Sequence, residues 1–368
     1  MSKSNVFFTD MRCQVGTSLL VKLERLIDRA GIEKIDFLNR FTAIKIHFGE
    51  PGNLAFLRPN FAKTLVDKVK SLGGLPFLTD CNTLYIGRRK HALEHLDTAN
   101  ENGFWPMSTG CQIIIGDGLK GTDDIEIEIP GGVYCKTAFL GRAIMDADII
   151  ISLNHFKGHE VSGFGGAIKN LGMGCGSRTG KTQMHLDGKP SVHSDICTGC
   201  GFCFKFCAQG ALSFDDDGKA YVDDVKCVGC GRCIAACNFD AIENDNWYGA
   251  YSQNCRMVEY TKAAINGRPN FHISIVNQVS PYCDCHDEND AAIVPDIGMF
   301  ASFDPIALDK ACIDAVNNAP VISTIINSDD YHGNDHFKEI HPESDWHSLF
   351  SHAEKIGLGN GDYTLTTI

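Results

Sequence analysis

The first half of the chain alternates short apolar runs with longer segments in which apolar residues recur at helical spacing. Such runs predict strands, and the 3.6-residue recurrence predicts amphipathic helices. The predicted strands are Val6–Phe8, Phe41–Phe48, Leu75–Thr79, Gln112–Gly116 and Ala147–Leu153. The predicted helices are Ser18–Ala30, Pro59–Leu72, Arg89–Asn102 and Thr137–Met145. Alternation of strands and helices is typical of α/β proteins.

This pattern stops near residue 190 and returns near residue 246. The later elements that we expect are helices near Met257–Ile265, at Pro305–Asn317 and at Pro342–Lys355, and a strand at Phe271–Val276. The later part holds too few strands for a sheet of its own. We therefore expect one α/β body, made of residues 1–189 and 246–368, with residues 190–245 inserted into it.

Eight of the seventeen cysteines repeat one spacing within the inserted segment. Each copy has the form C-x2-C-x2-C-x3-C, as in bacterial ferredoxins with two [4Fe–4S] clusters, where the fourth cysteine of each run ligates the other cluster. We expect cluster one to be held by Cys197, Cys200, Cys203 and Cys237, and cluster two by Cys227, Cys230, Cys233 and Cys207. The alternative that we weigh is a pair of structural zinc sites.

Two further features of the segment fit this interpretation. Gly199, Gly201, Gly229 and Gly231 would allow the backbone to bend closely around a cluster. Leu212–Phe214 and Ala220–Val222 flank a polar turn and predict a hairpin. The predicted fold is therefore a Rossmann-like α/β body with an inserted bacterial two-[4Fe–4S] ferredoxin domain.

Charge and the N-terminal sequence narrow the partners and the location that we expect. The chain has 33 basic and 46 acidic residues, a formal charge of −13. This disfavours nucleic acid and anionic membranes and favours a redox partner protein with a basic surface. We expect no membrane span, because no apolar run approaches the roughly 20 residues that a spanning helix needs. Without a secretory signal, the many cysteines predict reduced thiols in the cytoplasm of an anaerobic cell.

A second group of reactive side chains follows the most apolar predicted strand. Residues 154–176 are rich in glycine and contain His155, Lys157, His159, Lys169 and Cys175. Ligand sites in open α/β sheets gather at the carboxyl ends of strands. We take His155, Lys157, His159 and Lys169 as candidate catalytic residues, against the alternative of a structural loop with solvated lysines.

A third group, Cys283-Asp-Cys-His286, follows the predicted strand Phe271–Val276. Thiolates beside histidine are usual ligands of soft metals. Cys175, Cys283 and Cys285 are therefore a candidate third metal site. The alternative is that these cysteines are buried and inert.

Several longer motifs resemble the iron–sulfur centre proteins known as domain of unknown function 362. They include Asp80–Tyr85, Asn154–His159, Gly163–Asn170, Pro281–Cys285 and Ser302–Asp309. The resemblance implies an anaerobe-type protein with no settled reaction. A more local similarity, carried by His159 and Lys169 with three glycines between them, is to nickel-pincer lactate-racemase-type proteins. There a lysine carries the nucleotide cofactor and histidines surround the metal.

The function that we expect is that of an iron–sulfur redox protein. Two [4Fe–4S] clusters would pass electrons to or from a site in the α/β body. One alternative is an oxidoreductase or metallocofactor enzyme with its site at residues 154–176 and 283–286, holding an additional metal or nucleotide-type cofactor and a small-molecule substrate. Another is a non-catalytic partner in electron storage or cluster assembly.

Overall fold

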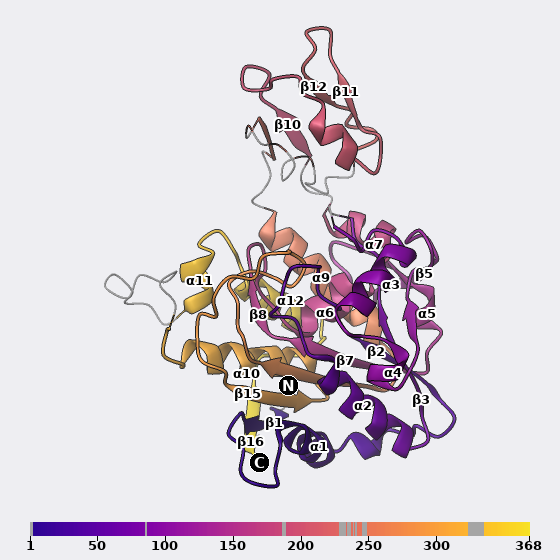
Figure 1. Cartoon of the computed structure of the whole chain (residues 1–368), viewed down its shortest axis with the longest axis vertical. Helices are drawn as coiled ribbons and strands as arrows, with labels where there is room; N and C mark the ends of the chain where they lie inside the picture. The colour runs from indigo at the N-terminus through magenta and orange to yellow at the C-terminus, as the bar shows by residue number, and fades with distance from the viewer. Residues whose placement is uncertain are drawn as a thin grey trace.

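A computed structural model describes residues 3–84, 87–185, 189–227, 233, 237, 239, 241–244, 249–322 and 335–368. Among these residues, eight strands form one central sheet in the order β16-β1-β15-β14-β7-β2-β3-β4 (Figure 1). They are β1 (Ser4–Asp10), β2 (Phe41–Lys45), β3 (Leu75–Asp80), β4 (Ile113–Ile115), β7 (Ile149–His155), β14 (Asn270–Val276), β15 (Gly298–Ser302) and β16 (Tyr363–Thr367).

The sheet is mixed, with mostly parallel pairs. All neighbouring strands from β14 to β4 are parallel, and so are β16 and β1. β15 is antiparallel to both of its neighbours, β1 and β14, so the sheet differs from the all-parallel Rossmann arrangement. Strands from both ends of the sequence share the sheet, which agrees with one body built from two parts. The boundaries at residues 189 and 246 stay predictions.

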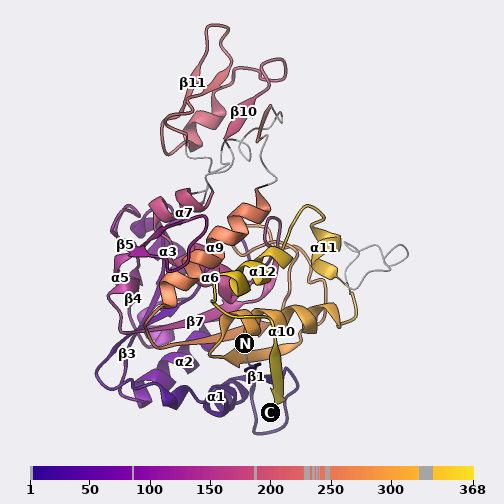
Figure 2. The same cartoon turned by 180° about the vertical axis from the view of Figure 1, so that it is seen from behind.

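Helices cover both faces of the sheet, as Figures 1 and 2 show. One face carries α1 (Leu19–Ala30) and α2 (Pro59–Ser71). The other carries α6 (Ala167–Cys175), α9 (Ala250–Ile265), α10 (Pro305–Asn317) and α12 (His347–Lys355). Side chains alternate across a strand. In β7, accordingly, Ile149 and Ile151 enter one core and Ile150 enters the other, all fully buried.

The smaller elements of the body connect these layers. Two hairpins pair β5 (Asp124–Glu128) with β6 (Thr137–Gly141) and β8 (Lys157–His159) with β9 (Gly163–Gly165). The remaining short helices are η1 (Ile32–Lys34), α3 (Ala92–Glu101), α4 (Pro106–Thr109), α5 (Arg142–Met145), α7 (Arg178–Met184) and α11 (His336–Ile340). In the described part of the chain, no helix combines the length and the apolar character that crossing a membrane requires.

The helix expected at Thr137–Met145 is wrong. Its first five residues form β6, and only Arg142–Met145 is helical. Ala138 and Leu140 are buried while Thr137 and Phe139 are half-buried, a two-residue alternation that suits a strand. Pairing with β5 favours the strand over the helix, because Ile125 and Ile127 lie opposite Leu140 and Ala138.

The segment after α7 forms a small module that stands apart from the body (Figure 1). It contains β10 (Pro190–Val192) paired with β13 (Ile242–Asn244), the turn η2 (Phe202–Phe206), and β11 (Leu212–Phe214) paired with β12 (Ala220–Val222). The β11–β12 pair confirms the expected hairpin. Cys230, Gly229 and Gly231 lie outside the described residues.

Candidate functional site

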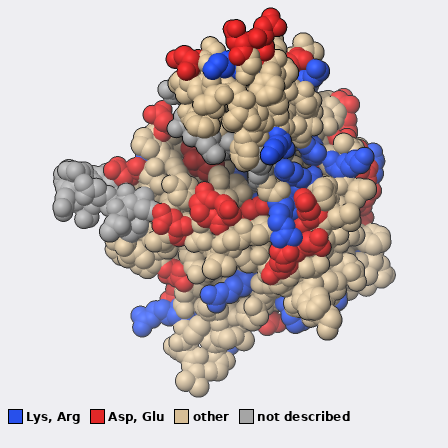
Figure 3. Space-filling model, turned by 45° about the horizontal axis from the view of Figure 1, so that its top comes forward, with Lys and Arg blue, Asp and Glu red and all other residues tan. Residues whose placement is uncertain are grey.

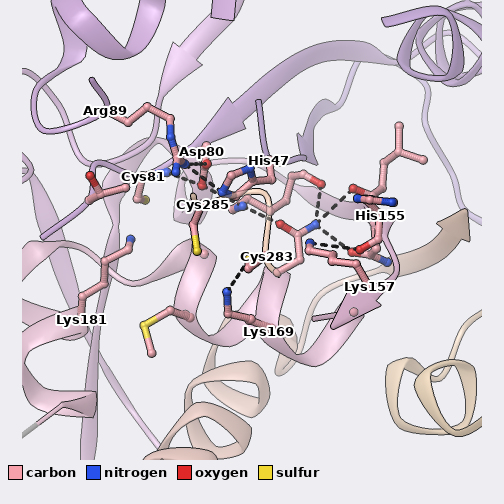
Figure 4. A pocket seen from close by; sticks show the side chains of 18 residues that line it. His47, Asp80, Cys81, Arg89, His155, Lys157, Lys169, Lys181, Cys283 and Cys285 are labelled. Atoms are coloured by element: carbon pink, nitrogen blue, oxygen red, sulfur yellow. Dashed lines mark hydrogen bonds and ion pairs between the residues drawn. The ribbon is translucent and has the colours of Figure 1, made fainter. Parts of the chain in front are cut away.

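A cavity of about 70 Å³ lies at the carboxyl ends of β2, β3 and β7 (Figure 4). Since one water needs roughly 10–15 Å³ by this measure, the cavity has room for a few waters or a small ligand. Lys45, Asp80 and His155 end the three strands and line it. The remaining lining residues are His47, Cys81, Thr83, Arg89, Leu153, Asn154, Lys157, Gly166, Lys169, Asn170, Met173, Gly174, Lys181, Cys283 and Cys285.

Two thiols and a lysine form the most reactive group of this cavity. Lys169 Nζ donates to Cys283 Sγ at 3.0 Å, as the dashed line in Figure 4 marks. A hydrogen bond between the two thiols raises the pKa of Cys283 and lowers that of Cys285, so Cys285 is the thiol that loses its proton first. Burial opposes a charged lysine, but the two facing sulfurs raise the pKa of Lys169 above its usual value. The group is an ammonium opposite two thiols that share a hydrogen bond.

Two close backbone contacts position these groups. Asp309 accepts from the backbone N–H groups of Ala167 and Ile168 at 2.7 and 2.8 Å, which fixes the start of α6, the helix that carries Lys169. A Cβ on Gly158 would lie 2.2 Å from the carbonyl oxygen of Pro281. Glycine at position 158 therefore lets the β8 hairpin approach the loop that leads to the two thiols.

His155 belongs to a buried network that forms part of the cavity wall. Its Nδ1 lies 2.8 Å from Asp284 Oδ1, and its Nε2 lies 2.8 Å from the carbonyl oxygen of Asn277. Lys157 Nζ lies 3.3 Å from Asp284 Oδ2. Burial opposes the charge of Asp284, but His155 and Lys157 lower its pKa below the usual value. Both ring nitrogens of His155 are engaged, so neither is free to bind a metal.

The opposite wall consists of buried ion pairs. Lys45 Nζ lies 2.8 Å from Asp80 Oδ1, and Arg89 Nε lies 2.8 Å from Glu50 Oε2. Arg89 Nη1 also lies 2.9 Å from His47 Nε2. Burial, followed by the charge of Arg89, holds the pKa of His47 well below its usual range, so this ring is neutral near pH 7. The charged side chains of this wall are therefore held in ion pairs.

His159 completes a group that could hold a metal. One ligand atom from each of His159, Cys283 and Cys285 lies within 4.8 Å of the others. Two thiolates and an imidazole suit a soft metal with an open coordination position. His159 Nδ1 accepts from the backbone N–H groups of Val161 and Ser162, both at 3.1 Å, so the neutral ring carries its proton on Nε2. A metal at Nε2 would displace that proton and require Nδ1 to give up these bonds.

The described cysteines of the module receive backbone hydrogen bonds. Cys197 Sγ accepts from Gly199 at 3.5 Å and from Ala220 at 3.4 Å. Cys207 Sγ accepts from Ala211 at 3.3 Å, and Cys237 Sγ accepts from Ala241 at 3.4 Å, which is the same four-residue step in each repeat. N–H groups directed at sulfur stabilise thiolates that ligate metal.

Segments of the module's backbone also approach one another closely near these sulfurs. Gly199 has a φ of +69°, which glycine adopts without strain. A Cβ on Gly199 would lie 2.4 Å from the carbonyl oxygen of Gly218. Burial raises the pKa of Cys203, and a backbone hydrogen bond lowers it. The neighbouring thiols of Cys200, Cys237 and Cys197 raise it further, and the resulting pKa is about 11. Cys237 of the second repeat is therefore close to cysteines of the first.

Residues 42–314 match the family model described as Domain of unknown function (DUF362). The chain belongs to this family. The match spans most of the body and the whole module, and it confirms the family resemblance seen in the sequence motifs. The two-cluster insert stays a prediction.

Individual relatives of this DUF362 chain are distant. A thylakoid-associated protein of Synechocystis sp. is 26% identical over 143 residues, which cover 37% of this chain and 38% of that protein. The lactate racemase apoprotein from Thermoanaerobacterium thermosaccharolyticum has 11% identity and a TM-score of 0.39, covering 74% of this chain and 51% of the other. A protein from Thermotoga maritima has 13% identity and a TM-score of 0.38, covering 80% and 57%. The chain spans little more than half the length of these solved structures, and we draw no conclusion on chemistry from them.

The cavity of the DUF362 chain brings together most of the residues that the sequence singled out. His155, Lys157, Lys169, Cys283 and Cys285 all line it. His159 does not line the cavity, but one of its ring nitrogens lies within 4.8 Å of the sulfurs of Cys283 and Cys285. Cys175 is fully buried at the end of α6 and is absent from both sets. Burial raises the pKa of Cys175 to about 11.

Sequence reasoning missed the opposite wall of the cavity, which contains the ion-paired Lys45, Asp80 and Arg89 and also His47 and Lys181. A signal for one of them was present, because Asp80 directly follows the predicted strand Leu75–Thr79. The strand-end rule, applied to every strand instead of only to the most apolar one, would have found Asp80, whereas Lys45 lies inside the predicted strand Phe41–Phe48 and ends the shorter observed β2. Arg89 and Lys181 come from a loop and a short helix, and no local pattern points to them.

Proposed function

We propose that the chain is an iron–sulfur redox protein. In this proposal residues 190–245 are a ferredoxin domain that holds two [4Fe–4S] clusters, and the cavity of the body exchanges electrons with them. Such clusters, when bound, supply one-electron transfer. The residues that would hold them are Cys197, Cys200, Cys203 and Cys237 for cluster one, and Cys227, Cys230, Cys233 and Cys207 for cluster two.

One observation carries the proposal. Cysteines of both repeats, including Cys203 of the first and Cys233 of the second, pack in one small core of the module, and Cys237 packs against it. Ligation that crosses between repeats requires this proximity. Two independent zinc sites would instead need each repeat to gather its own four ligands.

The backbone donors support the same assignment. The N–H groups of Gly199, Ala211, Ala220 and Ala241 are directed at three sulfurs whose charge they would offset. Hydrogen bonds to sulfur are also one of the levers that set the potential of a bound cluster. The module therefore has both the ligands and the second layer of contacts that a cluster site needs.

Ligand substitution in pairs tests the crossed assignment. Protein purified without oxygen should contain iron and acid-labile sulfide, and its reduced form should give the electron paramagnetic resonance signals of two interacting clusters. Cys203→Ser and Cys237→Ser should alter the same cluster, whereas Cys207→Ser and Cys227→Ser should alter the other. Cys13→Ser is the matched control, since Cys13 is exposed and lies outside the module.

Two results would contradict the proposal. One is zinc in place of iron and sulfide in freshly purified protein. The other is a pattern in which Cys207→Ser and Cys203→Ser affect the same cluster, because this would assign each repeat its own site.

The group of His159, Cys283 and Cys285 favours a second candidate function, a metallocofactor enzyme with its site in the cavity. Three ligands and an open position are typical of catalytic metal sites. Lys169 would then donate to a ligating thiolate or hold an anionic substrate group. Metal analysis of Cys283→Ser/Cys285→Ser protein tests this candidate. Loss of one metal equivalent that is not cluster iron supports it, and an unchanged metal content refutes it.

A further inference from the structure

A basic hollow lies where the module meets the body. It has a volume of about 320 Å³, and Lys90, Lys120, Arg178 and Lys205 line it beside Cys207. Figure 3 shows basic side chains gathered at one junction between the upper module and the body, on a surface that carries many acidic groups. We propose that this hollow is the docking surface for a small acidic electron-carrier protein. The inference rests on the proposed function, because Cys207 is the ligand through which the docked partner would exchange electrons.

The charge of the hollow is available to a partner. Lys120 and Lys205 are exposed and Arg178 is half-buried. Among the residues that the structure describes, no carboxylate forms an ion pair with Lys120, Arg178 or Lys205 at 4.0 Å or less. Lys205 Nζ instead lies 5.5 Å from the ring centre of Phe202, a contact that leaves its charge uncompensated.

Local charge outweighs total charge in choosing the partner. The formal charge of −13 alone favours a basic partner. Salt limits the reach of exposed charges to roughly 8 Å at physiological ionic strength. A partner that docks over Cys207 therefore experiences the four nearby cations more strongly than distant carboxylates. The negative charge of the rest of the molecule would orient an acidic partner by repelling it from other approaches.

Both the body and the module contribute cations to this junction, which gives the hollow a defined orientation. Lys90 precedes α3, Lys120 precedes β5 and Arg178 begins α7, all in the body, and Lys205 lies in η2 of the module. A carrier that contacts all of them sits against the module edge at Cys207. There a docked carrier would need only a short electron path.

Flavodoxin, a small acidic flavoprotein, is a suitable probe. Its anionic flavin hydroquinone gives up one electron and becomes the neutral semiquinone, while one cluster of the module gains that electron. Binding is measured by calorimetry on the oxidised proteins, and transfer is measured by the flavin semiquinone absorbance after rapid mixing without oxygen.

Charge reversal in the body tests the surface without changing any module residue. Lys120→Glu/Arg178→Glu should raise the dissociation constant for flavodoxin by roughly tenfold or more, because like charges then face each other. The transfer rate should fall in parallel and lose most of its salt dependence. Arg25→Glu/Lys34→Glu makes the same change in net charge at two exposed positions, on α1 and η1. This matched control should change binding by about twofold at most, since distant charges are screened.

The outcomes separate this inference from the proposed function. Equal weakening by both double variants would overturn the docking surface, because net charge alone would then explain binding. Failure of cluster-loaded wild-type protein to bind flavodoxin would overturn it too, as would tight binding of a single-stranded oligonucleotide in its place. Absence of iron and sulfide would refute the proposed function, and calorimetry would still decide whether the hollow binds an acidic protein.

Discussion

The buried ion pair between Lys45 and Asp80 leads to a prediction about stability. Their side chains are only 1% and 4% exposed, and Nζ lies 2.8 Å from Oδ1. Lys45 also donates to Asn170 Oδ1 at 2.7 Å. Lys45→Met would keep most of the side-chain volume but leave the carboxylate without its main partner. Removing one member of a buried pair costs about 3–5 kcal/mol.

The nearby cations compensate only in part. Arg89 Nη1 lies 3.7 Å from Asp80 Oδ2, and His95 Nε2 lies 3.8 Å from it. Burial lowers the pKa of His95 to about 3, so this ring is neutral near pH 7. Arg89 is charged but already bound to Glu50. We therefore expect the lower part of the range, about 3 kcal/mol.

Thermal unfolding measures this loss. Domains of 150–250 residues lose roughly 2–4 °C in melting temperature per kcal/mol, so a loss of about 3 kcal/mol should make Lys45→Met melt about 6 °C or more below the wild type. Lys63→Met is the matched control, because the Lys63–Asp67 pair is also 2.8 Å long but about half exposed. Exposed pairs of this kind contribute about 0.3–0.5 kcal/mol. Equal melting temperatures for the two variants would refute the reasoning.

The same variant should show a defined pH dependence. Burial alone would raise the pKa of Asp80, but the charge of Lys45, with that of Arg89, lowers it below the usual value. In the wild type this carboxylate therefore contributes stability above its unfolded pKa of about 3.9, and the contribution is lost as pH falls through the lower folded value. Without Lys45 burial dominates, and the folded pKa rises. The deficit of Lys45→Met relative to wild type should shrink as pH falls from 7 toward 4. A constant deficit would indicate that lost packing, not charge, is responsible.

Three further substitutions test other parts of the site. The hydrogen bond that His286 Nε2 donates to Glu160 raises the pKa of His286 to about 9, so Glu160→Gln should return it toward about 6.5 in a nuclear magnetic resonance titration. Glu259 accepts three backbone N–H groups and faces a histidine, and Glu259→Gln should cost about 1–3 kcal/mol of unfolding free energy, because an amide group would face donors. Gly158→Ala would place a methyl group 2.2 Å from the carbonyl oxygen of Pro281, and this overpacking should cost about 1–3 kcal/mol in thermal unfolding.

Each of these substitutions has a control in the chain. Glu288 lies 3.9 Å from His286 Nδ1, so Glu288→Gln should shift that pKa less than Glu160→Gln does. Glu126→Gln changes an exposed carboxylate on β5 and should leave stability nearly unchanged. A Cβ on Gly165 would lie 3.1 Å from the Lys157 side chain and 3.5 Å from the Lys169 side chain, and these are flexible groups, so Gly165→Ala should cost less than Gly158→Ala. The reverse order in any pair would contradict the contact on which the prediction rests.

Local patterns in the sequence predicted most of the central elements of the body. β7 begins with Ile149-Ile150-Ile151, and such apolar runs are typical of strands that are buried on both faces of a parallel sheet. α1 begins after Ser18, whose hydroxyl accepts from the Val21 N–H, and it ends at Gly31 with a φ of +90°. These are the signals by which a sequence marks the two ends of a helix. They depend only on neighbours in the chain.

Strand direction and order could not be read in the same way. β15, Gly298–Ser302, is buried throughout and is antiparallel both to β14, which precedes it in the chain, and to the N-terminal strand β1. Five buried residues give no sign of direction, because direction depends on the path by which the chain reaches the strand. β16 is mostly exposed and pairs only with β1, so its place at the edge depends on the N-terminal strand.

The sequence predicted the reactive residues of the cavity but not the buried ion pairs that surround them. Histidines and cysteines in glycine-rich loops attract attention because their chemistry is unusual. Lys45 and Arg89 resemble ordinary surface cations in the sequence, yet each is about 1% exposed. A buried cation needs a buried anion, and only the folded chain brings Asp80 and Glu50 to these positions.

The pairing of charges around the cavity indicates which group can change state. Three lining cations, Lys45, Arg89 and Lys157, each lie within 3.3 Å of a carboxylate oxygen, and Lys181 donates to a carbonyl oxygen. Lys169 differs, because it faces a thiol pair whose charge depends on protons, metal or oxidation. A change in the charge of the thiols would therefore leave the ion pairs intact and alter only the charge that faces Lys169. Lys169→Met should accordingly change the reactivity of the Cys283 and Cys285 thiols. It should leave the stability that the Lys45–Asp80 ion pair contributes unchanged. This combination distinguishes a reactive group from a purely structural one.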